Sequence, residues 1–482
     1  MTFPAPFSWP RQDARAGKLN GKFLIGVLST GIYCLPSCPA RPPRPENVRL
    51  FPTEAAAMAA GLRACKRCRP DLFYRGEDEN AALFEGLAGR VAAAPEKFAS
   101  ASALAKACGV SLTKLGDLLR DHAHMTPAVW LRRQRVAKAA RELLTTRERV
   151  AEIGYGAGFD SESVFHRQFV SLMRMTPGAY RALDGARTFL VHLPPGYRAR
   201  EVLAYHARDP EGVCEKNEGS VIWKALRTPD APVVLEISVE KEGAWVTVHA
   251  DKRLGRESMA MLHAASLRML SLTNTVTQFE TRHAAFTAGR RGLRLPLLPT
   301  GFDALCWAVI GQQINVRFAT ALRRDFIRLA GEKVGNMVAH PTPQRVAALD
   351  VSDLRGLHFS GSKAGYLIDA AQGVAKGELD IEGLAEGSAE GAEKRLTARR
   401  GIGTWTARYV MLRCGFADAA PVGDSALATA LQHLHGLAAR PDPDHAARLM
   451  SAFSPYRSLA TMHLWTSLKE RGQKETGLKE AS

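Results

Sequence analysis

The sequence RRGIGTWTARYV, residues 399–410, is typical of two helices joined by a tight hairpin. Gly401 and Gly403 allow the backbone to approach a phosphate closely, and the N-terminus of the second helix offers free N–H groups to it. Trp405 and Tyr409 lie four positions apart and share one face of that helix, where they can line a pocket or pack in the core. The hairpin therefore indicates a partner that contains phosphate.

An acidic residue follows the hairpin at a short distance. The sequence PVGDSAL, residues 421–427, places Asp424 after a glycine and directly before the apolar run SALATAL. An aspartate in this position can cap the N-terminus of a helix. It can equally supply a carboxylate to a pocket beside the hairpin, and the residues alone leave both alternatives open.

The composition favours a nucleic-acid partner. The chain has 482 residues, 46% of them hydrophobic, and a net charge of +17. This length exceeds one ordinary core, so we expect three or four domains. The positive charge favours a polyanion, although a merely soluble basic protein has the same signature. No run reaches the roughly 18 apolar residues of a membrane span. The N-terminus lacks a signal-peptide pattern, so we expect a cytoplasmic protein with reduced cysteines and no membrane partner.

Four segments differ in character, and together they predict a multidomain α+β protein. Residues 1–76 combine short strand-like runs with a helix over 53–65 and contain clustered cysteines. Residues 80–183 are predicted to be helices with two helix-turn-helix patterns. Residues 186–297 alternate like strands and add a long helical run, which predicts an α+β domain. Residues 298–470 are predicted to be mainly helical.

Four of the eight cysteines cluster near the N-terminus. Three residues separate Cys34 from Cys38, and two separate Cys65 from Cys68. In a reducing compartment this spacing favours one tetrahedral zinc site over two disulfides. Most such sites are only structural, but four thiolates on one zinc keep nucleophilic character. Basic residues that can hold a phosphate backbone flank the cysteines, namely Arg41, Arg44, Arg49, Arg63, Lys66, Arg67 and Arg69.

The sequences STGIYCLPSC and GLRACKRCRP resemble the N-terminal domain of the Ada adaptive-response family, over about residues 21–75. In that family the first cysteine takes a methyl group from a methylphosphotriester in DNA. The resemblance implies that Cys34 is both zinc ligand and methyl acceptor, while Cys38, Cys65 and Cys68 are ligands only. Methylation turns one thiolate into a neutral thioether, so the site then repels DNA less and acts as a switch.

Residues 83–183 resemble the AraC-type DNA-binding domain, with Gly109 in the first turn and the sequence MTP after both units. Two recognition helices are expected to enter successive major grooves. The resemblance further implies promoter DNA and RNA polymerase as partners. Residues expected to face base edges are Ser111, Lys114, Ser161 and His166. Residues expected to contact phosphates or solvent are Arg132, Arg133, Arg135 and Arg174. The alternative is a helical packing domain that does not bind DNA.

The hairpin, Asp424 and the strand-rich segment resemble the helix-hairpin-helix DNA glycosylase superfamily, in its AlkA-like 3-methyladenine branch, over about residues 187–470. The resemblance implies that Asp424 stabilises positive charge on the deoxyribose as the base departs and helps to align water. It implies that Trp405 and Tyr409 form an aromatic pocket for a flipped base, often a cationic one. It also implies that Gln312 and Gln313, in IGQQIN, enter the gap that the base leaves.

Two absences refine this expectation. Relatives that cleave the DNA strand carry a lysine where this chain has Trp405, so we expect a monofunctional glycosylase. Relatives with an iron–sulfur cluster carry four closely spaced cysteines near the C-terminus, where Cys414 is alone, so no cluster is expected.

The sequence therefore predicts a fused regulator and repair enzyme that acts on double-stranded DNA. Cys34 would sense alkylation, the AraC-type segment would read promoters, and the C-terminal part would excise alkylated bases. One alternative is a transcription regulator whose C-terminal half only binds DNA. Another is a glycosylase whose zinc segment merely holds DNA.

Overall fold

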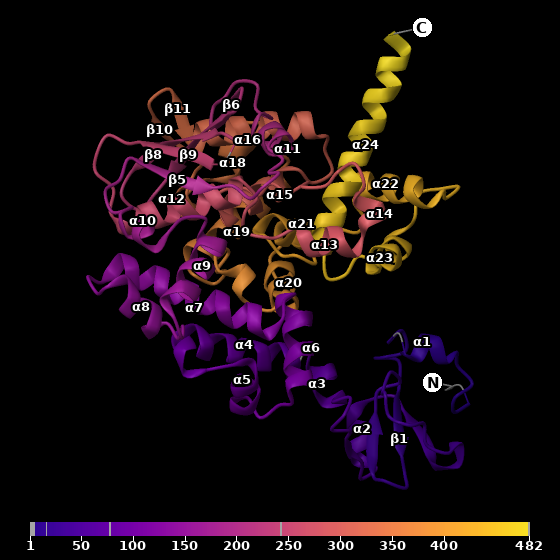
Figure 1. Cartoon of the computed structure of the whole chain (residues 1–482). Helices are drawn as coiled ribbons and strands as arrows, with labels where there is room; N and C mark the ends of the chain where they lie inside the picture. The colour runs from indigo at the N-terminus through magenta and orange to yellow at the C-terminus, as the bar shows by residue number, and fades with distance from the viewer. Residues whose placement is uncertain (1–4, 16, 77–78, 242, 481–482) are drawn as a thin grey trace. The chain divides into compact units, whose positions relative to one another are not determined.

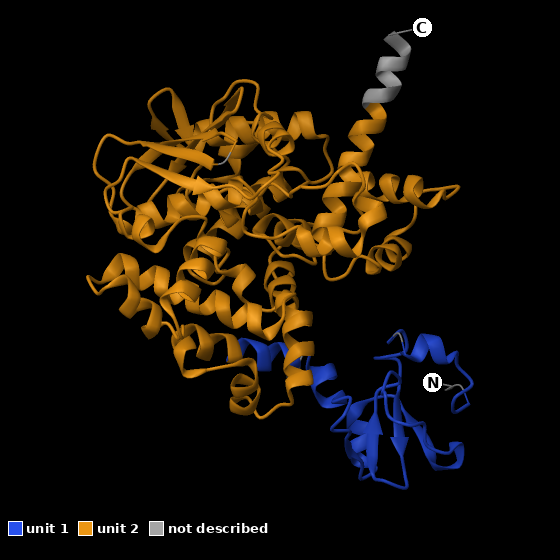
Figure 2. Ribbon diagram, viewed as in Figure 1, with its two compact units in different colours: residues 1–86 blue, residues 87–482 orange. Residues whose placement is uncertain are grey.

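The computed structural model describes residues 5–15, 17–76, 79–241 and 243–480 (Figure 1). The chain divides into two compact units, residues 1–86 and residues 87–482 (Figure 2). The multidomain α+β class expected from the sequence is confirmed. In this part of the chain, helices are too short or too polar to cross a membrane.

A small four-stranded sheet forms the centre of the first unit, in the order β3–β1–β2–β4. β1 pairs antiparallel with β2 and β3, whereas β2 and β4 run parallel. The strands are β1 (Leu24–Val27), β2 (Ile32–Cys34), β3 (Val48–Phe51) and β4 (Arg63–Ala64). The helices are α1 (Arg11–Arg15), α2 (Glu54–Ala59) and α3 (Pro70–Arg75).

Helix α2 is shorter than the helix expected over residues 53–65. Thr53 caps its N-terminus by accepting a hydrogen bond from the backbone N–H of Ala56, at 3.2 Å. The helix ends at Ala59 because Gly61, at φ +78°, takes a left-handed conformation that turns the chain into β4.

Short helices carry both expected helix-turn-helix patterns. Ser111 and Ser161 cap the second helix of each pair, accepting hydrogen bonds from Lys114 N (3.1 Å) and Val164 N (3.3 Å). Each turn contains a glycine with positive φ, Gly109 or Gly158. The pairs are α5 (Ala101–Ala107) with α6 (Leu112–Ala123), and α8 (Val150–Gly156) with α9 (Glu162–Met173). The remaining helices are α4 (Glu79–Ala93), α7 (Pro127–Thr145) and α10 (Pro177–Arg181).

A five-stranded antiparallel sheet follows, in the order β5–β9–β8–β7–β6, with α12 (Arg256–Met269) packed on its buried face. Phe165 and Phe169 of α9 belong to the same apolar cluster as Val191 of β5 and Leu262 of α12. The neighbouring His263 donates a hydrogen bond to the carbonyl of Met173, at 2.9 Å. The second helix-turn-helix therefore shares one core with the sheet. The strands are β5 (Thr188–His192), β6 (Glu215–Glu218), β7 (Val221–Arg227), β8 (Pro232–Val239) and β9 (Gly243–His249).

The C-terminal region is a helical assembly around α15 (Gly301–Ile310), every residue of which is buried. Its helices before the hairpin are α16 (Val316–Ala330), α17 (Pro343–Ala347), α18 (Val351–Arg355), α19 (Gly361–Ala375) and α20 (Ala389–Thr397). Those after the hairpin are α21 (Thr404–Cys414), α22 (Ser425–His435), α23 (Pro443–Ser451) and α24 (Arg457–Glu480). A short hairpin of β10 (Glu332–Val334) and β11 (Met337–Ala339) lies between α16 and α17 in sequence.

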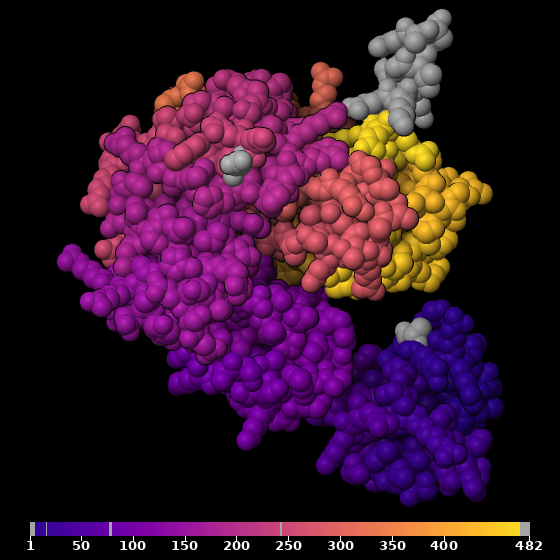
Figure 3. Space-filling view, viewed as in Figure 1, coloured from indigo at the N-terminus to yellow at the C-terminus, as the bar shows by residue number. Residues whose placement is uncertain are grey.

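Three helices of the sheet segment complete the fold, namely α11 (Arg200–His206), α13 (Thr277–Arg282) and α14 (Ala284–Thr287). Figure 3 shows the salmon-coloured segment that contains α13 and α14 against the yellow C-terminal helices. The rings of Phe279 and Tyr456 lie 6.0 Å apart, and those of Phe286 and Phe453 lie 4.7 Å apart. Aromatic packing therefore joins this segment to the C-terminal helices.

Four buried charges join the sheet to α15, and we call them the ion cluster: Glu215, Lys224, Asp303 and Arg323. Asp303 of α15 lies 3.2 Å from Lys224 Nζ and 2.9 Å from Arg323 Nη2. Arg323 also lies 3.3 Å from Glu215. Burial opposes ionisation of the two carboxyl groups, but Arg323 and Lys224 outweigh it and lower the pKa of Glu215 to about 2. The cluster is therefore two buried cations neutralised by two buried anions.

We expect Asp303→Asn to lower the free energy of unfolding by about 3–5 kcal/mol, because it leaves two buried cations with one anion. Urea denaturation provides the measurement. Glu236→Gln is the matched control, since Glu236 pairs with the half-exposed His249 at 2.7 Å and its loss should cost less than about 1 kcal/mol. Equal effects of the two substitutions would contradict the account of the ion cluster.

Candidate metal centre and candidate active site

The parallel pairing of β2 with β4 brings the two cysteine pairs together. Tyr33 is in register with Ala64, and the N–H of Cys65 donates to the carbonyl of Tyr33 at 3.0 Å. Cys34 at the end of β2 and Cys65 just after β4 therefore lie side by side. The Sγ atoms of all four cysteines, Cys34, Cys38, Cys65 and Cys68, lie within 4.8 Å of one another. None of them forms a disulfide.

The donor set fits tetrahedral zinc. Four sulfurs bound to one zinc at ~2.3 Å lie ~3.8 Å apart, which is compatible with sulfurs that all lie within 4.8 Å of one another. Hydrogen bonds with Cys38 and Cys68 raise the pKa of Cys34. Hydrogen bonds with Cys34 and Cys68 lower the pKa of Cys38. The thiols thus share protons, and a cation is needed before all four can ionise. Cys68 Sγ also accepts a hydrogen bond from the N–H of Leu35, at 3.4 Å.

The arginines of the first unit that were expected to contact phosphate differ in their exposure and in their ion pairs. The side chains of Arg41 and Arg67 are exposed. Arg44 is exposed and lies 4.0 Å from Glu46, a weak pair at the surface. Arg69 instead makes two hydrogen bonds of 3.0 Å to Asp71 of α3. Arg41, Arg44 and Arg67 thus remain candidates for DNA contact.

The starts of α6 and α9 lie at the surface of the second unit. Ser111 and Lys114 are exposed and His166 is half-buried, 3.9 Å from Glu162. Because the hydroxyls of Ser111 and Ser161 are used as helix caps, these residues position the helices. Their role in reading base edges stays a prediction.

Two arginines expected to contact phosphate or solvent face the protein instead. Arg133 of α7 donates to the carbonyl of Thr273, at 2.5 Å, and burial lowers its pKa. Arg135 donates to the carbonyls of Phe98 (2.7 Å) and Ala99 (3.2 Å). The expectation was wrong for both residues. Their hydrogen-bond partners lie in segments distant in sequence, so the local sequence pattern did not indicate them.

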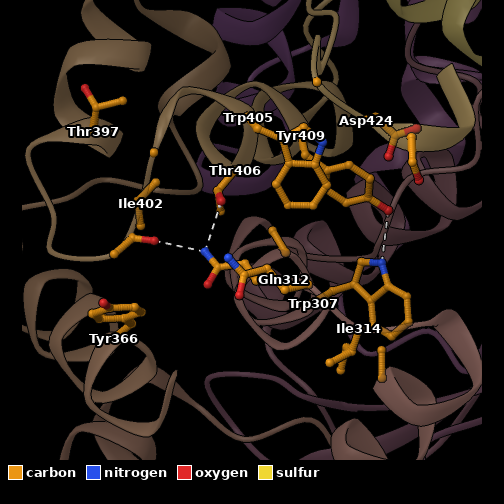
Figure 4. Close-up of a pocket in the computed structure, with 18 of the residues that line it drawn as sticks. Trp307, Gln312, Ile314, Tyr366, Thr397, Ile402, Trp405, Thr406, Tyr409 and Asp424 are labelled. Atoms are coloured by element: carbon orange, nitrogen blue, oxygen red, sulfur yellow. Dashed lines mark hydrogen bonds between the residues drawn. The ribbon is translucent and has the colours of Figure 1, made fainter. Parts of the chain in front are cut away.

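A cavity of about 1450 Å³ opens beside the hairpin. The residues that the sequence singled out in this half of the chain all line it: Gln312, Gln313, Gly401, Gly403, Trp405, Tyr409 and Asp424. They come from the segment after α15, from the hairpin, from α21 and from the start of α22. The fold therefore gathers these residues around one space (Figure 4).

Asp424 combines the two roles that the sequence left open. It caps α22, and its Oδ1 accepts hydrogen bonds from the N–H of Leu427, at 2.8 Å, and from Nε1 of Trp465, at 3.1 Å. Both donors bind the same oxygen. The carboxylate is thus fixed in orientation, while its second oxygen accepts no hydrogen bond from the residues that the structure describes.

Aromatic side chains form one wall of the cavity. Trp405 and Tyr409 stack with their centroids 5.6 Å apart and their planes at 27°. The hydroxyl oxygen of Tyr409 accepts a hydrogen bond from Trp307 Nε1 at 3.0 Å (Figure 4). It accepts a second one from Arg413 Nε at 3.3 Å. These contacts fix the rings in position.

The loop after α15 is braced from two sides. Gln312 donates to the carbonyl of Gly401 (2.9 Å) and to Thr406 Oγ1 (3.0 Å), so its side chain lies within the protein and not in the position expected at a DNA gap. Lys363 of α19 donates to the carbonyls of Ile310 and Gln312, both at 2.9 Å. Gln313 is exposed at the tip of the loop, with a positive φ of 56°.

The two hairpin glycines differ in their constraints. Gly401 has φ +80°, and a Cβ atom there would lie 2.1 Å from the ring of Tyr366, so only glycine fits. A Cβ atom on Gly403 would meet nothing within 4 Å. The hairpin surface is therefore open at Gly403, while Gly401 sets the shape of the turn.

Sequence reasoning missed several residues around this cavity, namely Trp307, Lys363, Tyr366, Arg413 and Trp465. Arg413 follows Trp405 and Tyr409 at the same spacing of four residues, so helical periodicity could have found it. The other four belong to α15, α19 and α24, and no local pattern connects them to the hairpin.

Three family models match the chain in succession. They are the metal binding domain of Ada over residues 8–71, a helix-turn-helix domain over residues 104–183, and the HhH-GPD superfamily of base excision DNA repair proteins over residues 306–455. These matches follow the order of the metal centre, the paired recognition helices and the cavity.

Individual proteins are also similar to this chain. The chain is 28% identical to a "probable bifunctional transcriptional activator/DNA repair enzyme AlkA" of Mycobacterium tuberculosis, with 95% of each chain covered. It is 32% identical to the "putative DNA-3-methyladenine glycosylase YfjP" of Bacillus subtilis, over 39% of this chain and 67% of that protein. A solved 3-methyladenine DNA-glycosylase from Archaeoglobus fulgidus has 19% identity and a TM-score of 0.51, covering 58% of this chain and 97% of that one. This last likeness concerns the fold alone.

We expect Lys363→Met to loosen the loop of residues 311–315, because it removes the hydrogen bonds that Nζ donates to Ile310, where the loop leaves α15, and to Gln312 within the loop. Hydrogen exchange of this segment should become about tenfold faster, while Lys363→Arg should retain most of the protection. Lys376→Met, at the exposed C-terminal end of the same helix, is the control and should leave the loop unchanged. Unchanged hydrogen exchange of the loop in Lys363→Met would refute the role of Lys363 in holding it.

Proposed function

Because the chain belongs to the HhH-GPD superfamily of base excision DNA repair proteins and carries an Ada-type metal-binding domain ahead of it, we propose that it both senses and repairs alkylated DNA. The C-terminal region excises bases of the 3-methyladenine type. The observation that carries this proposal is the carboxylate of Asp424, held by two donors on one oxygen at the edge of an aromatic cavity.

The proposed reaction uses the residues of the cavity in turn. A phosphate of the duplex binds at Gly403, where the start of α21 offers backbone N–H groups. Gln313, exposed at the loop tip, enters the space that the flipped nucleotide leaves. The free oxygen of Asp424 then stabilises positive charge at C1′ and aligns the attacking water.

Trp405 decides how the reaction ends. It occupies the position at which strand-cleaving relatives carry a lysine, and an indole cannot attack C1′ to form a covalent adduct. We therefore propose a monofunctional glycosylase that releases the base by hydrolysis and leaves the strand intact.

In the first unit we propose methyl transfer to Cys34, in a single turnover. The four cysteines would hold zinc, which would keep their sulfurs ionised. The Cys34 thiolate attacks the methyl carbon of a phosphotriester, the C–O bond breaks, and its electron pair restores the phosphate anion. Hydrogen bonds from the backbone at Leu35 to Cys68 and at Ala40 to Cys38 make those two sulfurs weaker nucleophiles.

The paired recognition helices complete the proposal. Methylation of Cys34 lowers the negative charge of the metal centre, so DNA is repelled less and promoter binding tightens. Transcription is then activated through contact with RNA polymerase.

We expect Asp424→Asn to lower the rate of 3-methyladenine release from methylated DNA by about 10²–10³-fold or more, because asparagine cannot stabilise the sugar cation. Asparagine still caps a helix, so the fold should persist. Asp442→Asn is the matched control, since Asp442 caps α23 in the same way through His445 N at 2.8 Å. Undiminished release by Asp424→Asn would leave only the alternative in which this half of the chain binds DNA without chemistry.

We expect Cys34 to gain one methyl group when the zinc-loaded protein is incubated with DNA that carries methylphosphotriesters. Peptide mass spectrometry locates the group, and the half-buried Cys108 serves as an internal control that should stay unmodified. An unmodified Cys34 in a protein that still holds its zinc would reduce the first unit to a DNA-holding module.

A further inference from the structure

Two guanidinium groups lie among the aromatic rings behind the base cavity. The Cζ atom of Arg208 is 3.7 Å from the ring centroid of Tyr205 and 4.7 Å from that of Trp307. The Cζ atom of Arg413 is 5.3 Å from the ring of Tyr409 and 5.5 Å from that of Trp465. Tyr409, one of the two rings expected to attract a cationic base, is thus already in contact with a cation of the protein.

Within the described part of the chain neither guanidinium has a carboxylate within 4.0 Å, although the charge of Asp424 acts on Arg413 from farther away and helps to raise its pKa. Arg413, which is 5% exposed, donates to the carbonyl of Pro296 (2.8 Å) and to the Tyr409 hydroxyl (3.3 Å). Arg208 donates to the carbonyl of Tyr205 (3.0 Å). Asp424 is the only acidic side chain among the described residues that line the cavity. We call the aromatic wall of Trp307, Trp405 and Tyr409 the base end of the cavity and the edge at Asp424 its sugar end. Two cations contact rings at or next to the base end, and one carboxylate lies at the sugar end.

The hydrogen-bond donors at the base end, like the two cations, favour a negatively charged group. The oxygen of Tyr409 already accepts hydrogen bonds from Trp307 and Arg413, which occupy its two lone pairs, so its own O–H is left to donate. Burial would raise the pKa of Tyr409, but the charges of Arg413 and Arg208 lower it, which makes the hydroxyl a stronger donor. Within the described residues Trp405 Nε1 also lacks an acceptor.

We propose that Arg413 is a specificity-determining residue that favours damaged bases which are neutral in DNA, such as hypoxanthine, relative to bases that carry a positive charge. The proposal rests on the glycosylase function proposed above and concerns the substrates of that same cavity. Arg413 acts on the base partly through Tyr409. The Tyr409 oxygen accepts hydrogen bonds from Trp307 and Arg413, so its own O–H is left to donate to the base.

The charge balance of the reaction explains the preference. When the C1′–N bond of a neutral base breaks, its electron pair leaves with the base, which becomes an anion. Water adds to C1′ and loses a proton, and the base anion takes up a proton from solvent. A positive field and two donors stabilise that anion as it forms. A cationic base leaves as a neutral molecule, so the same field opposes its binding and gives its departure no help.

The test compares two released bases within one preparation of each variant. Duplexes containing hypoxanthine or 7-methylguanine are incubated with wild type and with Arg413→Met, and the ratio of the two excision rates is measured. A misfolded fraction lowers both rates equally and leaves the ratio unchanged. We expect Arg413→Met to lower the hypoxanthine to 7-methylguanine ratio by about tenfold or more, and Arg413→Lys to preserve it.

Two further variants sharpen the test. Tyr409→Phe removes the donor hydroxyl but keeps the ring, and should lower the ratio in the same direction. Arg408→Met removes one positive charge from the same helix, where Arg408 pairs with Glu393 at 3.1 Å, and should leave the ratio unchanged.

The outcomes separate this inference from the function on which it rests. A ratio that is unchanged or raised in Arg413→Met overturns the specificity role and leaves Arg413 as a packing residue. Wild type that releases 7-methylguanine but not hypoxanthine also overturns it, while the glycosylase function stands. Wild type that releases neither base, and no 3-methyladenine, overturns the glycosylase function itself.

Discussion

The ion cluster is the interaction on which the candidate active site depends. Its four charges connect β6 and β7 of the sheet to α15 and α16, and Asp303 within it belongs to the buried helix α15. The same helix presents Trp307 to the cavity and ends at the loop that carries Gln313. Because removing one buried charge would strand the others, the cluster fixes α15 against the sheet and thereby fixes one wall of the cavity.

The two functional centres place their reactive atoms in different ways. In the first unit, one parallel strand pair aligns Cys34 with Cys65, and the metal completes the arrangement. In the second, a helix cap holds one oxygen of Asp424, while Arg413 contacts the ring of Tyr409 in the aromatic wall. The glycosylase reaction proposed above would use both charges, because it separates charge along one bond.

Much of this organisation could be predicted from sequence, because its signals are local. Cysteine spacing, the glycine hairpin and the caps at Ser111 and Ser161 depend on residues close together in the chain. Distant contacts could not be predicted: Arg133 is bound by the carbonyl of Thr273, and Gln312 turns inward to Gly401. Long-range packing also supplied Trp465, which lies 41 positions from the aspartate that it holds.

The central claim is that one chain performs two reactions, a methyl transfer that occurs once per chain and a base release that continues through many turnovers. The most direct measurement follows a single incubation with methylated DNA and counts methyl groups on the protein and free bases in solution over time. The account predicts that protein methylation stops at one group per chain, on Cys34, while base release continues through many turnovers. Methylation that never occurs, or base release that stops at one per chain, would contradict it.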